Sequence, residues 1–169
     1  MSVALLRSAK TFFSFSSSSS FSFASTLIPS FRPIHTSPTN NMPATIVKVP
    51  VIEDIHRAIN KAVDDHKDKD VFVYFYASID PATGKSWCPD CVTAGPIVEE
   101  YFSKIDNAVL VDAPVGDRPK WKDPNHFLRH DNIVKITAVP TLVHWATKSQ
   151  LVENDCEDVA KLDKFVKRA

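Results

Sequence analysis

Two cysteines separated by two residues form the part of this sequence best suited to chemistry. The segment SWCPDC spans residues 86–91 and places Cys88 and Cys91 three positions apart. If Cys88 opens a helix, both thiols lie on one face of that helix and can close and reopen a disulfide. The unpaired N–H groups and the positive end of the helix dipole favour the Cys88 thiolate, the nucleophilic form of cysteine. The spacing therefore indicates either a redox-active dithiol or half of a zinc site.

The rest of the sequence supplies few further metal ligands. Structural zinc needs about four ligands, and the third cysteine of the chain, Cys156, is isolated from the pair. The six histidines show no ligand spacing around the pair. We therefore expect no metal site. We interpret Cys156 as a packed structural thiol, with a third redox centre as the alternative.

The elements expected on either side of the cysteine pair would hold it at the end of a central strand. Residues 71–77 (VFVYFYA) are β-branched or aromatic almost throughout, the pattern of a strand buried on both faces of a sheet. Residues 78–86, with turn signals, are expected to form a loop between this strand and the pair. A helix is expected over residues 92–105, and Pro96 should kink it.

The chain from residue 42 onward alternates strand and helix patterns. Residues 114–124 are expected to form a loop, and Asp155 is expected to cap the last helix. The order β-α-β-α-β-α-β-β-α predicts an α/β domain with a mixed central sheet flanked by helices. The other expected strands are 45–49, 108–113, 136–145 (broken by Pro140) and 150–153, and the other expected helices are 51–65 and 125–130.

Composition and charge exclude several classes of protein. A chain of 169 residues suits one domain. Three of its 20 basic residues lie in residues 1–41, which leaves 17 basic against 20 acidic residues and no basic field for nucleic acid. No apolar run is long enough to span a bilayer, so we expect no membrane association. Three cysteines are too few for a secreted disulfide scaffold, and a CxxC pair in such a chain indicates catalysis or metal binding.

Residues 1–41 differ in composition from the rest of the chain. They are rich in Ser and Phe and contain no acidic residue, which is typical of a mitochondrial or chloroplast transit peptide. A translated pyrimidine-rich leader would have the same composition, and Met42 would then be the working start. The first interpretation implies a mitochondrial or chloroplast protein and the second a cytosolic one, and both remain open. In either case we treat residues 1–41 as a disordered leader and residues 42–169 as the domain.

Three features in the correct order resemble the thioredoxin superfamily. They are the strand and loop leading to WCxxC, Pro96 five residues after the second cysteine, and the later Val139-Pro140-Thr141. Within that superfamily, KSWCPDC (residues 85–91), VGDRPKWKDP (115–124) and TAVPT (137–141) resemble the Clot family, also called the thioredoxin domain-containing protein 17 family. The resemblance covers about residues 45–169 and implies a thioredoxin fold.

The resemblance implies a thiol–disulfide oxidoreductase that reduces small or selected disulfides. Cys88 would attack a substrate disulfide and Cys91 would resolve the mixed disulfide, leaving a Cys88–Cys91 disulfide. Pro140, if cis, would present the Val139 backbone to an extended substrate, and Trp87 would pack beside the disulfide. A monomer without bound cofactor is implied, with electrons from thioredoxin reductase or a glutathione-dependent system. The alternatives are a non-catalytic thioredoxin-fold interaction module and a disulfide isomerase or oxidant.

The sequence departs from ordinary thioredoxins around the pair. Pro89 and Asp90 replace the usual Gly-Pro, and the Asp90 charge opposes thiolate formation and would repel acidic substrates, although it also suits the first turn of a helix. Tyr74 stands where the family has a buried acid, so the usual proton acceptor for the resolving cysteine is missing and no replacement is identified. The long segments 78–86 and 116–121 are expected to enclose the site and select small or narrow disulfides.

Overall fold

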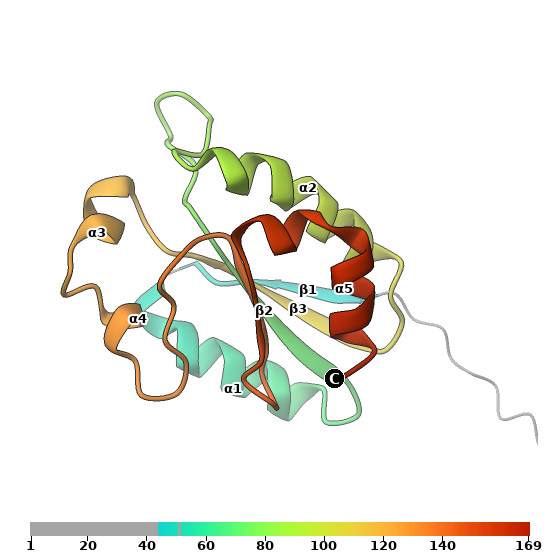
Figure 1. The fold of residues 1–169 in the computed structure, drawn as a ribbon. Coiled ribbons are helices and arrows are strands. Elements are labelled where there is room, and N and C mark those ends of the chain that lie inside the picture. Colours follow the sequence, from blue (N-terminus) through green and yellow to red (C-terminus); the bar gives the residue numbers. More distant parts are fainter. Residues whose placement is uncertain (1–43, 51) are drawn as a thin grey trace, which may run out of the picture. The chain divides into compact units, whose positions relative to one another are not determined.

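The structure is a computed structural model that describes residues 44–50 and 52–169 (Figure 1). The leader predicted for residues 1–41 lies outside the described residues, as does residue 51, the expected start of the first helix. All structural statements below concern the described part of the chain.

Five strands form one mixed sheet in the order β1-β3-β2-β4-β5. Strands β1 and β2 each pair in parallel with β3, β4 is antiparallel to β2, and β5 is antiparallel to β4. The central position of β2 explains its apolar sequence, because residues 71–75 are all buried. The strands are β1 (Thr45–Lys48), β2 (Asp70–Tyr76), β3 (Ala108–Pro114), β4 (Thr141–His144) and β5 (Gln150–Val152).

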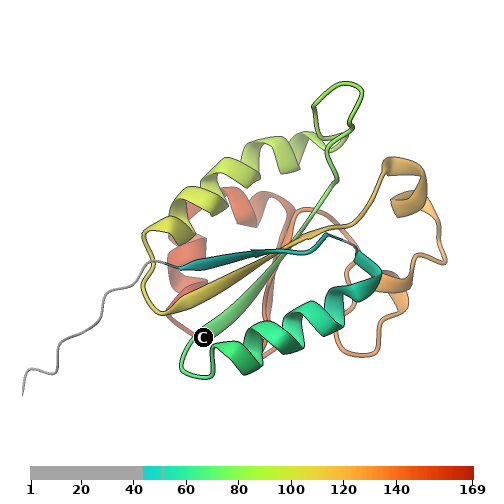
Figure 2. The ribbon, with the colours of Figure 1, turned by 180° about the vertical axis from the view of Figure 1, so that it is seen from behind.

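Helices cover both faces of the sheet. Helix α1 lies on one face, and α2 and α5 lie on the other (Figures 1 and 2). The two short helices α3 and α4 precede β4 in the chain. The helices are α1 (Ile55–Asp65), α2 (Pro89–Ser103), α3 (Arg118–Lys122), α4 (Phe127–His130) and α5 (Val159–Val166), with short 3-10 helices η1 (Ile52–Asp54) and η2 (Glu153–Glu157).

Alternate residues of β2 pack against the two helical layers. Val73 and Phe75 belong to the cluster that contains Ile59 of α1. Phe72 faces the other layer, where its ring centroid lies 5.1 Å from that of Phe102 of α2. Burial of such side chains contributes about 1.5–3 kcal/mol each, so the strand that leads to the cysteine pair is firmly held on both faces.

The predicted α/β fold class and mixed sheet are confirmed, with local differences. The segment expected as a loop, 114–124, contains helix α3, whose start is capped by the Asp117 carboxylate accepting the Lys120 N–H at 2.9 Å. The strand expected over 136–145 is limited to β4, because Pro140 has no N–H to donate to a sheet ladder. Pro96 lies inside α2, which continues to Ser103.

The predicted cap of the last helix is wrong. Asp155 lies within η2, and its carboxylate accepts a hydrogen bond from the Lys161 Nζ at 2.5 Å. The cap of α5 is Asp158, whose carboxylate accepts the N–H groups of Ala160 at 2.9 Å and Lys161 at 3.3 Å. Helix α5 therefore begins three residues later than an Asp155 cap would have placed it.

Replacing the observed cap should destabilise the domain more than replacing the expected one. We expect Asp158→Ala to lower the free energy of unfolding by about 1 kcal/mol, the usual cost of losing an N-cap. The matched control Asp155→Ala removes only an exposed ion pair and should change it by less than about 0.5 kcal/mol. Urea denaturation measures both values, and an equal loss in the two variants would contradict this assignment.

Candidate active site

The cysteine pair lies at the start of α2, directly after the loop that follows β2. Cys88 is the N-cap residue, and Pro89 occupies the first turn, where a proline sacrifices no helical hydrogen bond. Asp90 follows in the same turn and is half-buried. The expectation that Cys88 opens a helix is confirmed.

The Cys88 sulfur is held between the helix start and the loop before β4. Its Sγ accepts the backbone N–H of Cys91 at 3.4 Å, and its thiol donates to the Val139 carbonyl oxygen at 3.5 Å. The Val139–Pro140 peptide bond is cis. The structure therefore brings Cys88 and Val139, distant in sequence, into contact, and the N–H donors of the helix start favour negative charge on the sulfur.

Cys91 has a different environment from Cys88. It is as buried as Cys88 but lies one turn along α2, where the Ala77 N–H points at its sulfur at 3.4 Å. Burial raises the pKa of Cys91 far above its ordinary value, with a further increase from the adjacent Cys88, and the Ala77 N–H offsets only part of this rise. Both cysteines are free thiols. The Cys91 thiol is therefore protonated at neutral pH, and it must transfer that proton to a base before it can act as a nucleophile.

Trp87 connects the two segments expected to enclose the site. Its indole Nε1 donates to the Gly116 carbonyl oxygen at 3.0 Å. The Ser78 N–H donates to the same oxygen at 3.2 Å, and the Gly116 N–H donates back to the Ser78 Oγ at 3.0 Å. A cavity of about 310 Å³ lies between the two segments. Its lining comprises Ser78, Ile79, Asp80, Pro81, Trp87, Asp117, Arg118 and Pro119.

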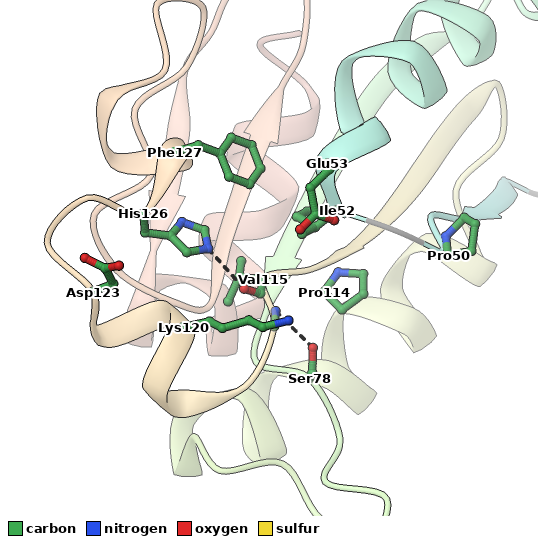
Figure 3. Close-up of a pocket in the computed structure, with 11 residues that line it drawn as sticks. Pro50, Ile52, Glu53, Ser78, Pro114, Val115, Lys120, Asp123, His126 and Phe127 are labelled. Atoms are coloured by element: carbon green, nitrogen blue, oxygen red, sulfur yellow. Dashed lines mark hydrogen bonds between the residues drawn. The ribbon is translucent and has the colours of Figure 1, made fainter.

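The Gly116 segment also borders a cavity next to η1. A second cavity, of about 460 Å³, lies there between η1 and the segment that carries α3 (Figure 3). His126 in this cavity contacts the Val115 carbonyl oxygen through its Nε2 at 3.3 Å. Desolvation lowers the pKa of His126. Neither cysteine lines this cavity, so it is separate from the dithiol.

The loop after β2 is a small hairpin rather than an open coil. Ile79 and Ser86 pair across it, and the Asp80 N–H donates to the Lys85 carbonyl oxygen at 2.9 Å. Gly84 turns the chain at a φ of 67°, which favours glycine. Figure 1 shows this hairpin, in light green, projecting beyond the start of α2. Ile79 is 61% exposed there, so the hairpin presents an apolar side chain beside the dithiol.

A third cavity, of about 570 Å³, lies behind Cys91 and contains a carboxylate that sequence reasoning missed. Tyr74 and Asp112 line it, and they are register partners on β2 and β3. Asp112 is 3% exposed, and burial raises its pKa to about 6, with the Glu99 charge adding to the rise and the Lys48 charge opposing it. The sequence feature that could have indicated this carboxylate is the single acidic residue in the otherwise apolar strand 108–113.

The third cysteine, Cys156, is packed inside the domain. Cys156 is fully buried, its thiol donates to the Leu151 carbonyl oxygen at 3.3 Å, and burial raises its pKa to about 12.

Across residues 44–50 and 52–169, no group of three or more His, Cys, Asp or Glu side chains could hold a metal ion. None of the helices in the same residues has the length and apolarity needed to cross a membrane.

Comparisons with known proteins show what this chain is similar to. The family model described as "Thioredoxin domain-containing protein 17-like, thioredoxin domain" matches residues 49–168. Thioredoxin domain-containing protein 17 of Homo sapiens is 46% identical over 111 residues, covering 65% of this chain and 85% of the relative. Thioredoxin-like protein Clot of Arabidopsis thaliana is 44% identical over 86 residues, covering 50% and 64%. The oxidized structure of thioredoxin O1 from Arabidopsis thaliana aligns with a TM-score of 0.48 at 23% identity, covering 73% and 96%.

The buried Asp112 carboxylate should make stability depend on pH. Because its folded pKa of about 6 exceeds the ordinary value of 3.8, the folded state binds more protons between these values, and its stability falls as pH rises through them. Asp112→Asn should therefore be more stable than wild type above pH 6, by up to about 3 kcal/mol, and equal to it below about pH 4.

Urea denaturation across this pH range measures the difference. The control Asp64→Asn, at an exposed position of α1, should follow wild type at every pH. Superimposable curves for Asp112→Asn and wild type would contradict the burial of this charge.

Proposed function

The chain belongs to the thioredoxin domain-containing protein 17-like family, and from this premise we propose that it is a thiol–disulfide oxidoreductase that reduces disulfides. The observation that carries the proposal is the position of Cys88, whose sulfur caps α2 beside the Val139 carbonyl while Cys91 lies one turn behind it. An attacking thiolate needs such N–H donors, and a resolving thiol needs the second position.

In the first step the Cys88 thiolate attacks one sulfur of the substrate disulfide. A Cys88–substrate S–S bond forms, the substrate S–S bond breaks, and the other substrate sulfur leaves with the electron pair and takes up a proton. The Cys91 N–H and the positive end of the α2 dipole stabilise the attacking thiolate.

In the second step the Cys91 thiolate attacks the Cys88 sulfur of the mixed disulfide. The Cys88–Cys91 bond forms, the Cys88–substrate bond breaks, and the second substrate thiolate leaves. The substrate has then gained two electrons and the dithiol has lost two. A reductase protein, either thioredoxin reductase or a glutathione-dependent system, would return these electrons, so the chain itself needs no bound cofactor.

The surroundings of the dithiol support small or selected disulfides as substrates. An extended substrate would pair with the Val139 backbone, and the half-buried Asp90 would disfavour acidic groups. The hairpin of residues 78–86 and the Gly116 segment are joined through Trp87 and Ser78, and together they would narrow the approach of a substrate to Cys88. A non-catalytic interaction module has less support, because such a module would not need both thiols in this arrangement.

Cysteine variants test the two steps separately. Reduction of insulin and of cystine is followed as NADPH consumption with thioredoxin reductase, and in parallel with the glutathione-dependent system. We expect wild type to turn over at least one substrate, Cys88→Ser to have no activity, and Cys91→Ser to accumulate a mixed disulfide detectable by mass spectrometry. The buried Cys156→Ser variant should retain activity and serves as the control. Absence of wild-type turnover on both substrates with both systems would refute the proposal.

Shortening the hairpin should widen the range of substrates. Replacing residues 80–85 with a two-residue Asn-Gly turn preserves the pairing of Ile79 with Ser86 and the Ser78 contacts with Gly116. We expect the rate with insulin, a folded protein disulfide, to rise relative to the rate with cystine. A length-preserving variant, Lys85→Ala, should keep the wild-type ratio. An unchanged ratio in the shortened protein would remove the hairpin from substrate selection.

A further inference from the structure

The second step of the proposed reaction requires a group that removes the Cys91 proton. Burial raises the pKa of Cys91 well above neutral, so the thiol does not ionise unaided at the rate that a resolving cysteine needs. Tyr74 occupies the position expected for a buried acid, and its own pKa is also raised strongly by burial and by the Cys91 and Asp112 charges. Tyr74 therefore stays protonated and cannot be the base.

Three polar side chains stand abreast across the sheet, beneath α2. Asp112 on β3 is the register partner of Lys48 on β1 and of Tyr74 on β2. All three line the same cavity of about 570 Å³, and Cys91 lines it from α2. The row thus connects the exposed Lys48 at the edge of the sheet with the buried Cys91 thiol.

Asp112 is the one carboxylate buried below the surface in the part of the chain that the structure describes. The groups that face it are Lys48 from β1, Tyr74 and Tyr76 from β2, and Glu99 from α2. The Tyr74 hydroxyl is buried and forms no hydrogen bond within the described residues. Leaving a buried hydroxyl without a hydrogen-bond partner is energetically costly. A water molecule in this cavity would therefore gain a hydrogen bond to the Tyr74 hydroxyl.

We propose that Asp112 accepts the proton of Cys91 through this cavity when the mixed disulfide is resolved. The proposal rests on the oxidoreductase function proposed above and assigns a residue to its second step. Cys91–SH loses its proton to the Asp112 carboxylate, which becomes a carboxylic acid. The Cys91 thiolate then forms the S–S bond with Cys88, and the Cys88–substrate bond breaks with release of the substrate thiolate.

The chemistry of Asp112 suits this transfer. A base is most effective when its pKa lies near the working pH, and the burial of Asp112 moves its pKa to about 6. At neutral pH the carboxylate is therefore mostly ionised and ready to accept a proton. The cavity has room for water molecules, and together with the Tyr74 hydroxyl they would bridge the carboxylate and the thiol.

A single-turnover experiment isolates the proposed step. The reduced protein is mixed with one equivalent of dithiobis(nitrobenzoate), a symmetrical disulfide whose released thiolate is coloured. Attack by Cys88 releases the first coloured thiolate, and resolution by Cys91 releases the second. Stopped-flow absorbance between about pH 5 and pH 8 therefore gives the rate of each step as a function of pH.

The Asp112→Asn variant should be slowed in the second phase alone. We expect that phase to slow by on the order of 10²-fold at neutral pH, the usual contribution of a general base. In wild type its rate should show an inflection near pH 6, which Asp112→Asn should lose, leaving a rate proportional to hydroxide concentration. The first phase, measured in Cys91→Ser with and without Asp112→Asn, should be the same. A second phase of wild-type rate and pH dependence in Asp112→Asn would overturn the proposal.

Two variants at the cavity edge test the same idea with Asp112 in place. Glu99→Gln removes a charge that raises the Asp112 pKa and should move the inflection to lower pH, and Lys48→Met should move it to higher pH. An inflection that stays in place in both variants, or that disappears in Glu99→Gln, would also overturn the proposal. These variants decide the matter if Asp112→Asn fails to fold. If wild type released no thiolate, the oxidoreductase function itself would fail, a result distinct from the loss of the second phase only.

Discussion

The N-terminus of helix α2 is capped by a sulfur atom, that of Cys88, rather than by the usual side-chain oxygen. The Cys91 N–H donates to the Cys88 Sγ, so one hydrogen bond both starts α2 and holds the reactive atom in place. A thiolate accepts such a hydrogen bond better than a thiol does. Strand β2 determines where this can occur, because its burial on both faces fixes the point at which the chain leaves the sheet.

The two cysteines lie one turn apart at the start of α2 and have different neighbours. The Cys88 sulfur lies at the positive end of the α2 dipole and contacts the Val139 carbonyl oxygen in the loop before β4. Cys91 lies where desolvation dominates, so its thiol is held neutral. The raised pKa of Cys91 is the reason that the proposed second step needs a proton acceptor.

Local patterns in the sequence were sufficient to predict the dithiol and its supporting strand. The apolar run 71–77 has one reasonable interpretation, and the CxxC with Pro140 later in the chain indicated the family. Choosing between Asp155 and Asp158 as a helix cap was beyond local reasoning, since both are acids near the start of the same predicted helix and only the backbone course of η2 separates them. Asp112 could not be found because its importance lies in its register with Tyr74, which depends on pairing between strands far apart in sequence.

The contacts around Gly116 have a consequence for how such a domain can diversify. Trp87 donates a hydrogen bond to the Gly116 carbonyl oxygen, and Ser78 forms hydrogen bonds with both the carbonyl oxygen and the N–H of Gly116. These contacts involve the Gly116 backbone and no side chain of that segment. With a φ of 97°, this position favours glycine, while its neighbours in residues 117–120 are exposed and carry no such restriction. Mutation of residues 117–120 can therefore change the chemical character of the surface next to Trp87 while the hydrogen bonds to the Gly116 backbone hold that segment in position.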